Sequence, residues 1–375
     1  MSLIETKLQN WRIKAPRLDK NMYRPQNYGA LDFFIGQSNL PYGILTPELK
    51  AKAEVSMGNT IQMPVIAYDG DVQVSNVRTC TIEDNENTSA LVSLVFATYQ
   101  VGFTMVPAAY MNNEIGYEQD FGRKMEKVSR ALANALDTAA IAALEANKTE
   151  VFGNLLYYTE SGDSVQVAWD LRTEIFGDLN PMMRANDYNG AIHIIGNTGV
   201  DSQLRKLAEH GLYNDVNKQL EYGDKILHFT NNLTNEEGVF GTFYAVEDGN
   251  VGMLTRVDRE AARGASANGH EWGKTRLPYI DLNVGYHYYT AVGDQSGIVG
   301  AATADLTCGV KEYYGFSVDV AFIVAYNSST STIAQPIIKG EILKSAQTNV
   351  MAKPIYVTND EDSPVPTKEV TEAAE

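Results

Sequence analysis

The sequence is poor in the residues that mark several common classes of protein. Only two of its 375 residues are cysteines, Cys80 and Cys308, which excludes a disulfide framework and a cysteine-rich zinc site. Basic residues are scarce as well, and the formal net charge is −17. A dedicated nucleic-acid binder needs clustered Lys and Arg to neutralise phosphates, so this class is disfavoured. An acidic balance of this size is typical of a particle surface that stays in solution.

Long hydrophobic runs are missing too. No charged-then-apolar signal peptide opens the chain, and the longest apolar run, 318 to 326, is interrupted by Asp319. We therefore expect the protein to remain in the compartment where it is made, a reducing cytoplasm.

Motifs for catalysis, nucleotide binding and metal binding are also absent. The turn GNTG at 196 to 199 lacks the full glycine fingerprint and the P-loop lysine, and GDQSG at 293 to 297 lacks the spacing of a nucleophile elbow. The five histidines never fall at ligand spacing, and Asp69 and Asp71 do not continue into a calcium loop. We expect a protein that is not an enzyme and that has no metal or cofactor.

The clearest element that is present is a long amphipathic helix from Tyr117 to Ala146. Apolar side chains recur at steps of three and four residues, namely at Phe121, Met125, Val128, Leu132, Leu136, Ala139/Ala140 and Ala143/Leu144. At 1.5 Å per residue this helix is roughly 45 Å long. Asn147 is expected to close it in a left-handed conformation. Because no second helix repeats the pattern, we expect it to lie across a sheet rather than in a coiled coil.

Residues 1 to 56 have little sustained periodicity and are predicted to form an arm. Up to Asn27 the segment is net +4, because six basic residues stand against Glu5 and Asp19. The six are Lys7, Arg12, Lys14, Arg17, Lys20 and Arg24. Such a segment is either disordered or docked on another surface. Its aromatic residues favour docking, and they are Tyr23, Tyr28, Phe33, Phe34 and Tyr42.

Residues 58 to 110 have the alternation of strands. Apolar residues alternate from Ile61 to Ala67, a turn is expected at YDGD (68 to 71), and Val72 and Val74 resume the alternation. A second extended run covers 99 to 105. The sequence therefore predicts a long β-hairpin excursion before the long helix.

Helices and strands alternate from about 165 to 265, which indicates a compact α/β unit. We expect helices at 164–176 and 201–210, and strands at 191–195, 225–231, 239–246 and 249–256. Long strands follow at 282–288 and 316–326, and only the long helix matches their length. Residues 359 to 375 form an acidic tail of net charge −5, with six acidic residues against Lys368, and should be disordered.

This order of parts resembles the major capsid proteins of tailed double-stranded DNA bacteriophages, which have the α+β Hong Kong 97-type, or Johnson, fold. GNTIQMPV at 58 to 65 and the run from QDF at 119 to 121 through VSRALAN at 128 to 134 are similar to coat proteins of short-tailed phages. The resemblance implies six parts: an N-terminal arm (1–56), an E-loop (57–110), a P-domain with the spine helix (111–164), an α/β A-domain (165–270), returning strands (271–358) and an acidic tail (359–375).

The resemblance also implies a function. The chain would be a structural subunit that assembles as hexamers and pentamers into an icosahedral virion shell around phage DNA, in the host cytoplasm. Expected partners are other copies of the chain, a portal protein, packaged DNA bound without sequence specificity, and a separate scaffolding protein, because no long helical segment precedes the arm. No membrane partner is expected. An encapsulin-like nanocompartment shell, and more distantly an enzyme or an adhesin, are alternative hypotheses.

Some members of this family join subunits by isopeptide bonds from an E-loop lysine to an asparagine of the next subunit. This sequence has no lysine between Lys52 and Lys124. We therefore predict a non-covalent shell in which the acidic hairpin lies on a basic patch of the adjoining subunit. Candidate contact residues are Arg12, Arg17 and Arg24 of the arm, Asp69, Asp71, Arg78, Glu83 and Asp84 of the hairpin, and Lys124, Lys127 and Arg130 of the long helix.

Overall fold

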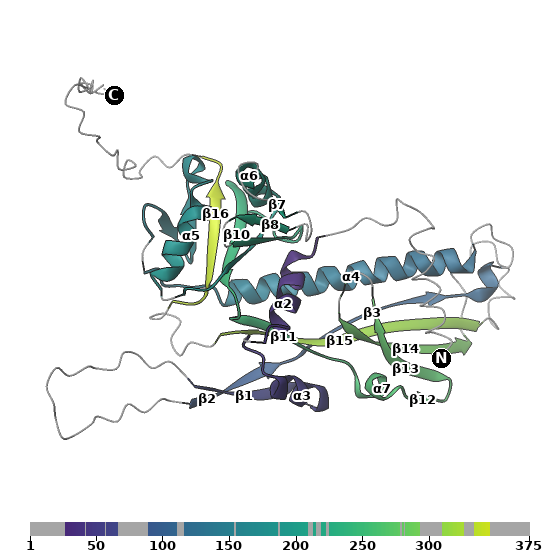
Figure 1. Cartoon of the computed structure of the whole chain (residues 1–375). Helices are drawn as coiled ribbons and strands as arrows, with labels where there is room; N and C mark the ends of the chain where they lie inside the picture. Colours follow the sequence, from purple (N-terminus) through teal and green to yellow (C-terminus); the bar gives the residue numbers. More distant parts are fainter. Residues whose placement is uncertain are drawn as a thin grey trace, which may run out of the picture.

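The computed structural model describes residues 27–41, 43–56, 58–66, 89–110, 116–153, 155–186, 188–208, 213–214, 219–222, 225–277, 280, 282–292, 310–325 and 334–345. The described part consists of one long helix, several shorter helices, two larger sheets and a small two-stranded sheet (Figure 1). None of the described helices is long and apolar enough to cross a membrane. The acidic tail and residues 1–26 of the arm lie outside the described residues.

The long helix α4 runs from Tyr117 to Ala146, as the sequence predicts. The apolar stripe from Phe121 to Leu136 is buried in the main hydrophobic core, as are Ala140 and Leu144. Ala139 and Ala143, the alternatives at the last two positions, are only partly buried. Glu118 and Asp120 stand in the first turn, where the helix dipole favours negative charge. The expected left-handed end is wrong, because Asn147 has φ −120° and its side chain instead donates to the carbonyl of Ala143 over 2.7 Å.

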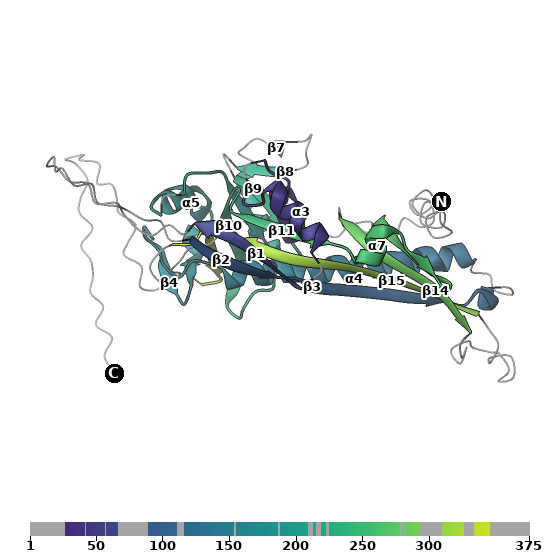
Figure 2. The same ribbon diagram turned by 90° about the horizontal axis from the view of Figure 1, so that it is seen from below.

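A sheet built around one very long strand lies along α4 (Figures 1 and 2). Its strands are β3 (Ala97–Met105), β11 (Val251–Arg256), β12 (Ser266–Ala267), β13 (His270–Arg276), β14 (Asn283–Val292) and β15 (Val310–Val324). Strand β15 has 15 residues, so β14 and β11 pair with successive parts of it while β3 also pairs with it. This confirms the expected match between long strands and the long helix.

The second sheet forms a separate body at one end of α4 (Figure 1). Its strands are, in order, β4 (Thr159–Ser161), β5 (Ser164–Val167), β16 (Ile337–Leu343), β10 (Val239–Glu247), β6 (Ile192–Gly196), β9 (Lys225–Phe229), β8 (Gln219–Tyr222) and β7 (Tyr213–Asn214). Helices α5 (Ile175–Arg184) and α6 (Thr198–Ala208) contribute to its hydrophobic core, as does residue Phe243 from the central strand β10.

Two expectations about this body are wrong. Residues 164 to 176 are not one helix: strand β5 comes first, then the 3-10 turn η2 (Trp169–Leu171), and α5 begins only at Ile175. Val165 and Val167 alternate with polar residues, so the segment pairs with β4 and β16. The α/β unit also ends earlier than 265, because β11 leaves it to pair with β15.

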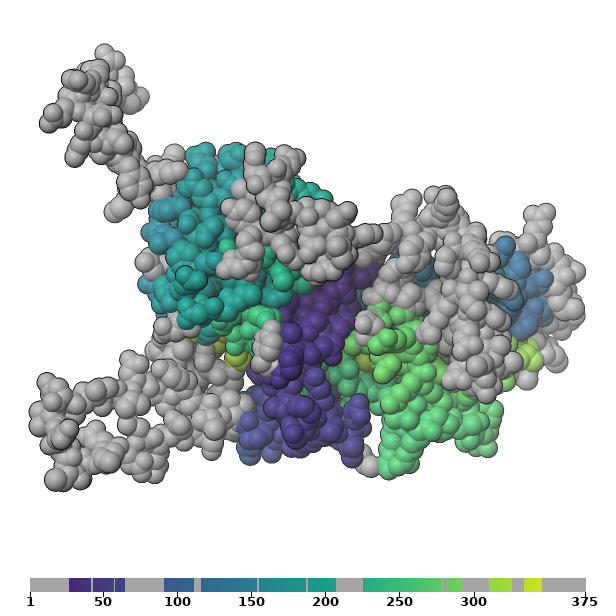
Figure 3. All heavy atoms as spheres, in the orientation of Figure 1, coloured from purple at the N-terminus to yellow at the C-terminus, as the bar shows by residue number. Residues whose placement is uncertain are grey.

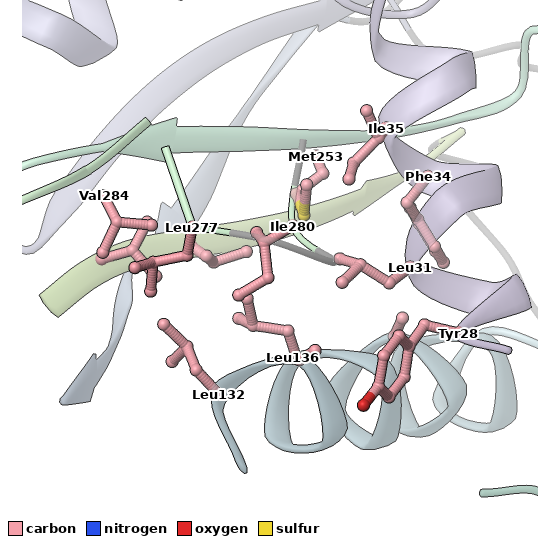
Figure 4. Packing of buried hydrophobic residues seen from close by; sticks show 14 of the residues in the cluster. Tyr28, Leu31, Phe34, Ile35, Leu132, Leu136, Met253, Leu277, Ile280 and Val284 are labelled. Carbon is pink, nitrogen blue, oxygen red and sulfur yellow. The ribbon is translucent and has the colours of Figure 1, made fainter. Parts of the chain in front are cut away.

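The second half of the predicted arm contains two helices, which its weak periodicity did not indicate. Helix α2 (Gly29–Ser38) packs between α4 and β11, and Leu31, Phe34 and Ile35 enter the main core (Figure 4). Thr46 caps the start of helix α3 (Pro47–Val55), and its hydroxyl accepts from the Leu49 backbone amide over 3.3 Å. The docking that the aromatic residues predicted is found for Tyr28, Phe33 and Phe34, and the surface that they contact is their own chain.

The hairpin before α4 exists, but its partner strands differ from the expected ones. Strand β1 (Thr60–Ile66) pairs antiparallel with β2 (Ser89–Val95), from Thr60 opposite Val95 to Ile66 opposite Ser89. The expected turn at 68–71 and the resumed strand at 72–74 lie in 67–88, outside the described residues. The extended run from 99 to 105 is confirmed as β3, and the 3-10 helix η1 (Pro107–Tyr110) follows it.

Candidate functional site

The outer face of the β1–β2 hairpin carries exposed apolar side chains. Directly opposed residues of an antiparallel pair share a face, so Ile61 and Leu94 point to the core side. Pro64, opposite Leu91, points outward, and Val95 lies on the same outer face. Leu91 is 64% exposed and Val95 is 66% exposed. Within the described residues each hairpin strand pairs only with the other, and Lys52 of α3 donates to the Gln62 carbonyl of β1 over 3.0 Å.

One arginine fixes the root of this hairpin to the long sheet. Arg256 forms an ion pair with Asp319 (Nε to Oδ2 2.9 Å) and donates to the carbonyls of Ser56 (3.1 Å) and Gly58 (2.6 Å). Its guanidinium also lies 4.3 Å from the centre of the Phe96 ring. Because Arg256 and Asp319 are both nearly buried, this pair sets the direction in which the hairpin leaves the body.

The three candidate cations on α4 lie on or near its solvent side but differ in their partners. Lys124 forms an ion pair with Asp120 (2.9 Å) and donates to the Thr104 carbonyl (3.0 Å). Arg130 forms an ion pair with Glu126 (2.7 Å). Lys127 is exposed. The other candidates, Arg12, Arg17, Arg24, Asp69, Asp71, Arg78, Glu83 and Asp84, lie outside the described residues.

The turn from β6 to α6 is built as an ordinary helix cap. The helix starts at Thr198, earlier than the expected residue 201, because the Asn197 side-chain oxygen accepts from the Gly199 amide over 3.1 Å. Gly199 lies against the carbonyl of Phe240, which leaves no room for a side chain. A phosphate site therefore has no support here, and the GDQSG segment at 293–297 lies outside the described residues.

Four of the five histidines form two pairs in space that the sequence spacing does not reveal. His193 Nδ1 lies 2.9 Å from His228 Nε2, and His270 Nδ1 lies 2.8 Å from His287 Nε2. No group of three or more metal-ligating side chains occurs among the described residues, so neither pair extends to a metal centre.

The first pair lies in a cleft between α2 and strands β6 and β9, with a volume of about 690 Å³. His193 Nε2 is 3.2 Å from a carboxylate oxygen of Asp248, and the Gln37 side chain donates to that same oxygen over 2.6 Å. Burial lowers the pKa of His193, and burial together with the neighbouring His193 lowers the pKa of His228 to about 3. Both imidazoles are therefore uncharged near neutral pH.

No family model and no curated protein matches this sequence. Solved structures are similar to it over most of its length. "Capsid of Ralstonia phage GP4" aligns with 87% of this chain and 93% of its own at 11% identity and a TM-score of 0.49. "Mycobacterium phage Bobi" aligns with 87% and 94% at 14% identity and 0.49. "Capsid structure of the Cyanophage P-SCSP1u" aligns with 78% and 86% at 12% identity and 0.43.

This chain is similar to phage capsid structures. Similarity at this level of identity transfers no residue role from those chains to this one.

Sequence reasoning missed several polar residues that join segments distant in the sequence. Asp137 lies on the buried side of α4. Its carboxylate accepts from the Leu31 backbone amide (2.9 Å), the Thr230 hydroxyl (2.5 Å) and the Asn232 side-chain amide (2.8 Å). Its place one residue after Leu136 in the apolar stripe is the signal that could have marked it. Arg256 and the histidine pairs gave no such signal, because their partners are distant in sequence.

Proposed function

We propose that this chain is a major capsid protein, the shell-forming subunit of a tailed double-stranded DNA phage. The observation that carries the proposal is the hairpin β1–β2, which is anchored at its root by Arg256 and exposes Leu91 and Val95 on its outer face. A two-stranded sheet is marginally stable by itself in water, and exposed apolar residues on such a sheet mark a contact with another chain.

The elongated body suits a subunit that is surrounded by copies of itself. A 30-residue helix beside a 15-residue strand gives a rigid spine, and the hairpin and the second sheet extend from it on different sides (Figure 1). Extended parts that overlap neighbours bury area that a compact body cannot. Closed shells of this kind are built from hexamers and pentamers of one subunit.

Charge supports a non-covalent contact between neighbours. The segment from 58 to 110 is net −4, with five acidic residues against Arg78, and contains no lysine. We propose that this acidic hairpin lies on the α4 surface that bears Lys127, with Lys124 and Arg130 beside it. Because Lys124 and Arg130 already have acidic partners on α4, Lys127 supplies most of the attraction, and added salt should weaken the contact.

The remaining partners belong to the same proposal. The shell encloses DNA without reading its sequence, and it is assembled in the host cytoplasm with a separate scaffolding protein and a portal protein. The role is structural rather than catalytic, and it requires no cofactor and no membrane.

Sedimentation of purified full-length protein tests the hairpin contact. Leu91→Ser with Val95→Ser removes the exposed apolar side chains, so the double variant should melt like the unmodified protein but stay a small species. Val310→Ser removes an exposed apolar side chain at the start of β15, outside the hairpin, so it is the matched control and should assemble normally. If the double variant formed the same large particles with the same yield, this face would not be a contact between subunits.

A further inference from the structure

On one side of the cleft between α2 and strands β6 and β9, the surface of α2 is exposed. Asp32 and Gly36 are exposed and lie one turn apart on α2, while Gln37, His193, Asp201 and Asp248 line the rest of the cleft. A Cβ added at Gly36 would meet no atom within 4 Å. Glycine is unfavourable inside a helix, and packing within the described part of the chain does not require it here. The exposed surface of α2 at Gly36 therefore leaves room for another segment to pack closely against it.

The charge of the cleft is negative. Asp32, Asp201 and Asp248 contribute three carboxylates, whereas Arg205 is the one lysine or arginine in the lining and pairs with Asp201 over 2.8 Å. The lining is thus net −2, three acidic groups against one basic group. The two histidines add no positive charge near neutral pH, because burial keeps their pKa values low. A positively charged segment would be attracted to this surface.

A segment of the required charge begins at the edge of this cleft. Asn27 lines the cleft, its carbonyl accepts from the Asn231 amide over 3.4 Å, and Tyr28 forms a β-bridge with Thr230. The 26 residues that precede Asn27 carry six basic and two acidic side chains, a net charge of +4. Figure 3 shows α2, in purple, exposed between the two larger bodies, so the segment is tethered beside the surface that it complements.

We propose that residues 1–26 dock, as a basic segment, in the acidic cleft between α2 and strands β6 and β9 of their own chain. The contact is set by charge, and the tether at Asn27 keeps the segment at high local concentration. This inference does not depend on the proposed function, because it concerns a single subunit.

Limited trypsin digestion of the full-length free subunit tests the docking. Lys14, Arg17 and Lys20 are cleavage sites inside the segment, and the cleavage rate at each is read by mass spectrometry. A docked segment is protected, and added salt should speed cleavage because it screens the charges. Protection should not change with protein concentration. Protection that rises with concentration would place the segment in the cleft of a second copy and overturn the assignment to its own chain.

A pair of variants of opposite charge separates the effect of charge from the effect of added side-chain volume. Gly36→Lys should raise the cleavage rate in the segment by about two- to fivefold, the factor that one screened surface charge supplies. Gly36→Glu places a side chain of similar size in the same space and should leave the rate unchanged or lower it. If both variants accelerated cleavage of the segment equally, the proposal that charge holds the segment in the cleft would be overturned.

Two further variants serve as a control and as a safeguard. Gly177 in α5 is also a helical glycine whose added Cβ would meet nothing within 4 Å, and it lies outside the cleft, so Gly177→Lys should not change cleavage. Asp32→Asn removes one negative charge without adding bulk and should also accelerate cleavage, which keeps the test valid if Gly36→Lys folds poorly. Unchanged cleavage in Asp32→Asn and Gly36→Lys would overturn the proposal.

Discussion

At the residue scale, a few buried polar side chains join segments that are far apart in sequence. Asp137 is fully buried and connects α4 to the first turn of α2 and to the segment after β9. Arg256 does the same for the hairpin root and β15. The partners of neither residue could be predicted from the sequence, because they lie between 63 and 200 residues away and leave no local pattern.

Removing the Asp137 carboxylate should destabilise the subunit strongly. Asp137→Ala leaves the buried Leu31 backbone amide and the buried Thr230 hydroxyl without their acceptor, and each unsatisfied buried donor costs about 1–3 kcal/mol. Asp137→Asn keeps one acceptor oxygen and should lose less. Thermal unfolding of the two variants measures the difference, and an alanine variant as stable as the unmodified protein would refute the role of Asp137.

The His193–His228 pair should make the subunit sensitive to acid. Because the folded chain holds the pKa of His228 near 3, below its ordinary value of 6.5, the unfolded chain takes up a proton that the folded chain does not. Stability should therefore fall as the pH drops below about 6.5, by an amount on the order of a few kcal/mol in total.

Urea unfolding at pH 7.5 and at pH 5 measures this effect. His228→Gln cannot titrate, so its loss of stability between the two pH values should be smaller than that of the unmodified protein. Equal losses would show that His228 does not contribute to the acid sensitivity.

At the element scale, the sequence predicts those elements that bury one face. Helix α4 and the strands β3, β14 and β15 were expected because each alternates apolar and polar residues with the period of its own structure. Helix α2 escaped prediction because eight of its ten residues are buried, so it has no polar face and no period. The pairing of β1 with β2 was not expected, because a local Asp-Gly signal says nothing about a strand that begins more than 20 residues further along the chain.

A charge in the buried stripe of α4 should prevent folding. Leu136 is completely buried against α2 and the long sheet, so Leu136→Asp buries an unpaired carboxylate at a cost of about 3–5 kcal/mol. Lys127→Asp changes an exposed position of the same helix and is the control for folding. The yield and melting temperature of soluble subunit report the result, and a normal melting temperature for Leu136→Asp would mean that α4 is not the spine of the fold.

At the scale of the whole molecule, the assignment of strands to the two larger sheets could not be predicted from the sequence. The chain leaves and re-enters each sheet once: it returns to the long sheet at β11, directly after β10 of the other sheet, and it returns to that other sheet at β16, after β15. Such crossings depend on pairing between distant strands, which no local pattern encodes. The sequence predicted the candidate contact surface only as an acidic hairpin. Its exposed apolar face could be identified only from the register of β1 and β2.

The absence of lysine between Lys52 and Lys124 leads to a prediction about assembled particles. Boiled in detergent and run on a denaturing gel, they should give a single band near the mass of 41.3 kDa of the chain. A ladder of multimers that resist reducing agent would reveal covalent links between subunits and contradict the non-covalent contact.

Electron microscopy of the purified, expressed protein tests the central claim most directly. Hairpins that contact neighbours on several sides should close the subunits into angular, icosahedral shells. Small shells filled with a protein cargo would point to a nanocompartment instead. A protein that remains monomeric at every salt and protein concentration, with no shells on the grid, would contradict the assignment of this chain as a capsid subunit.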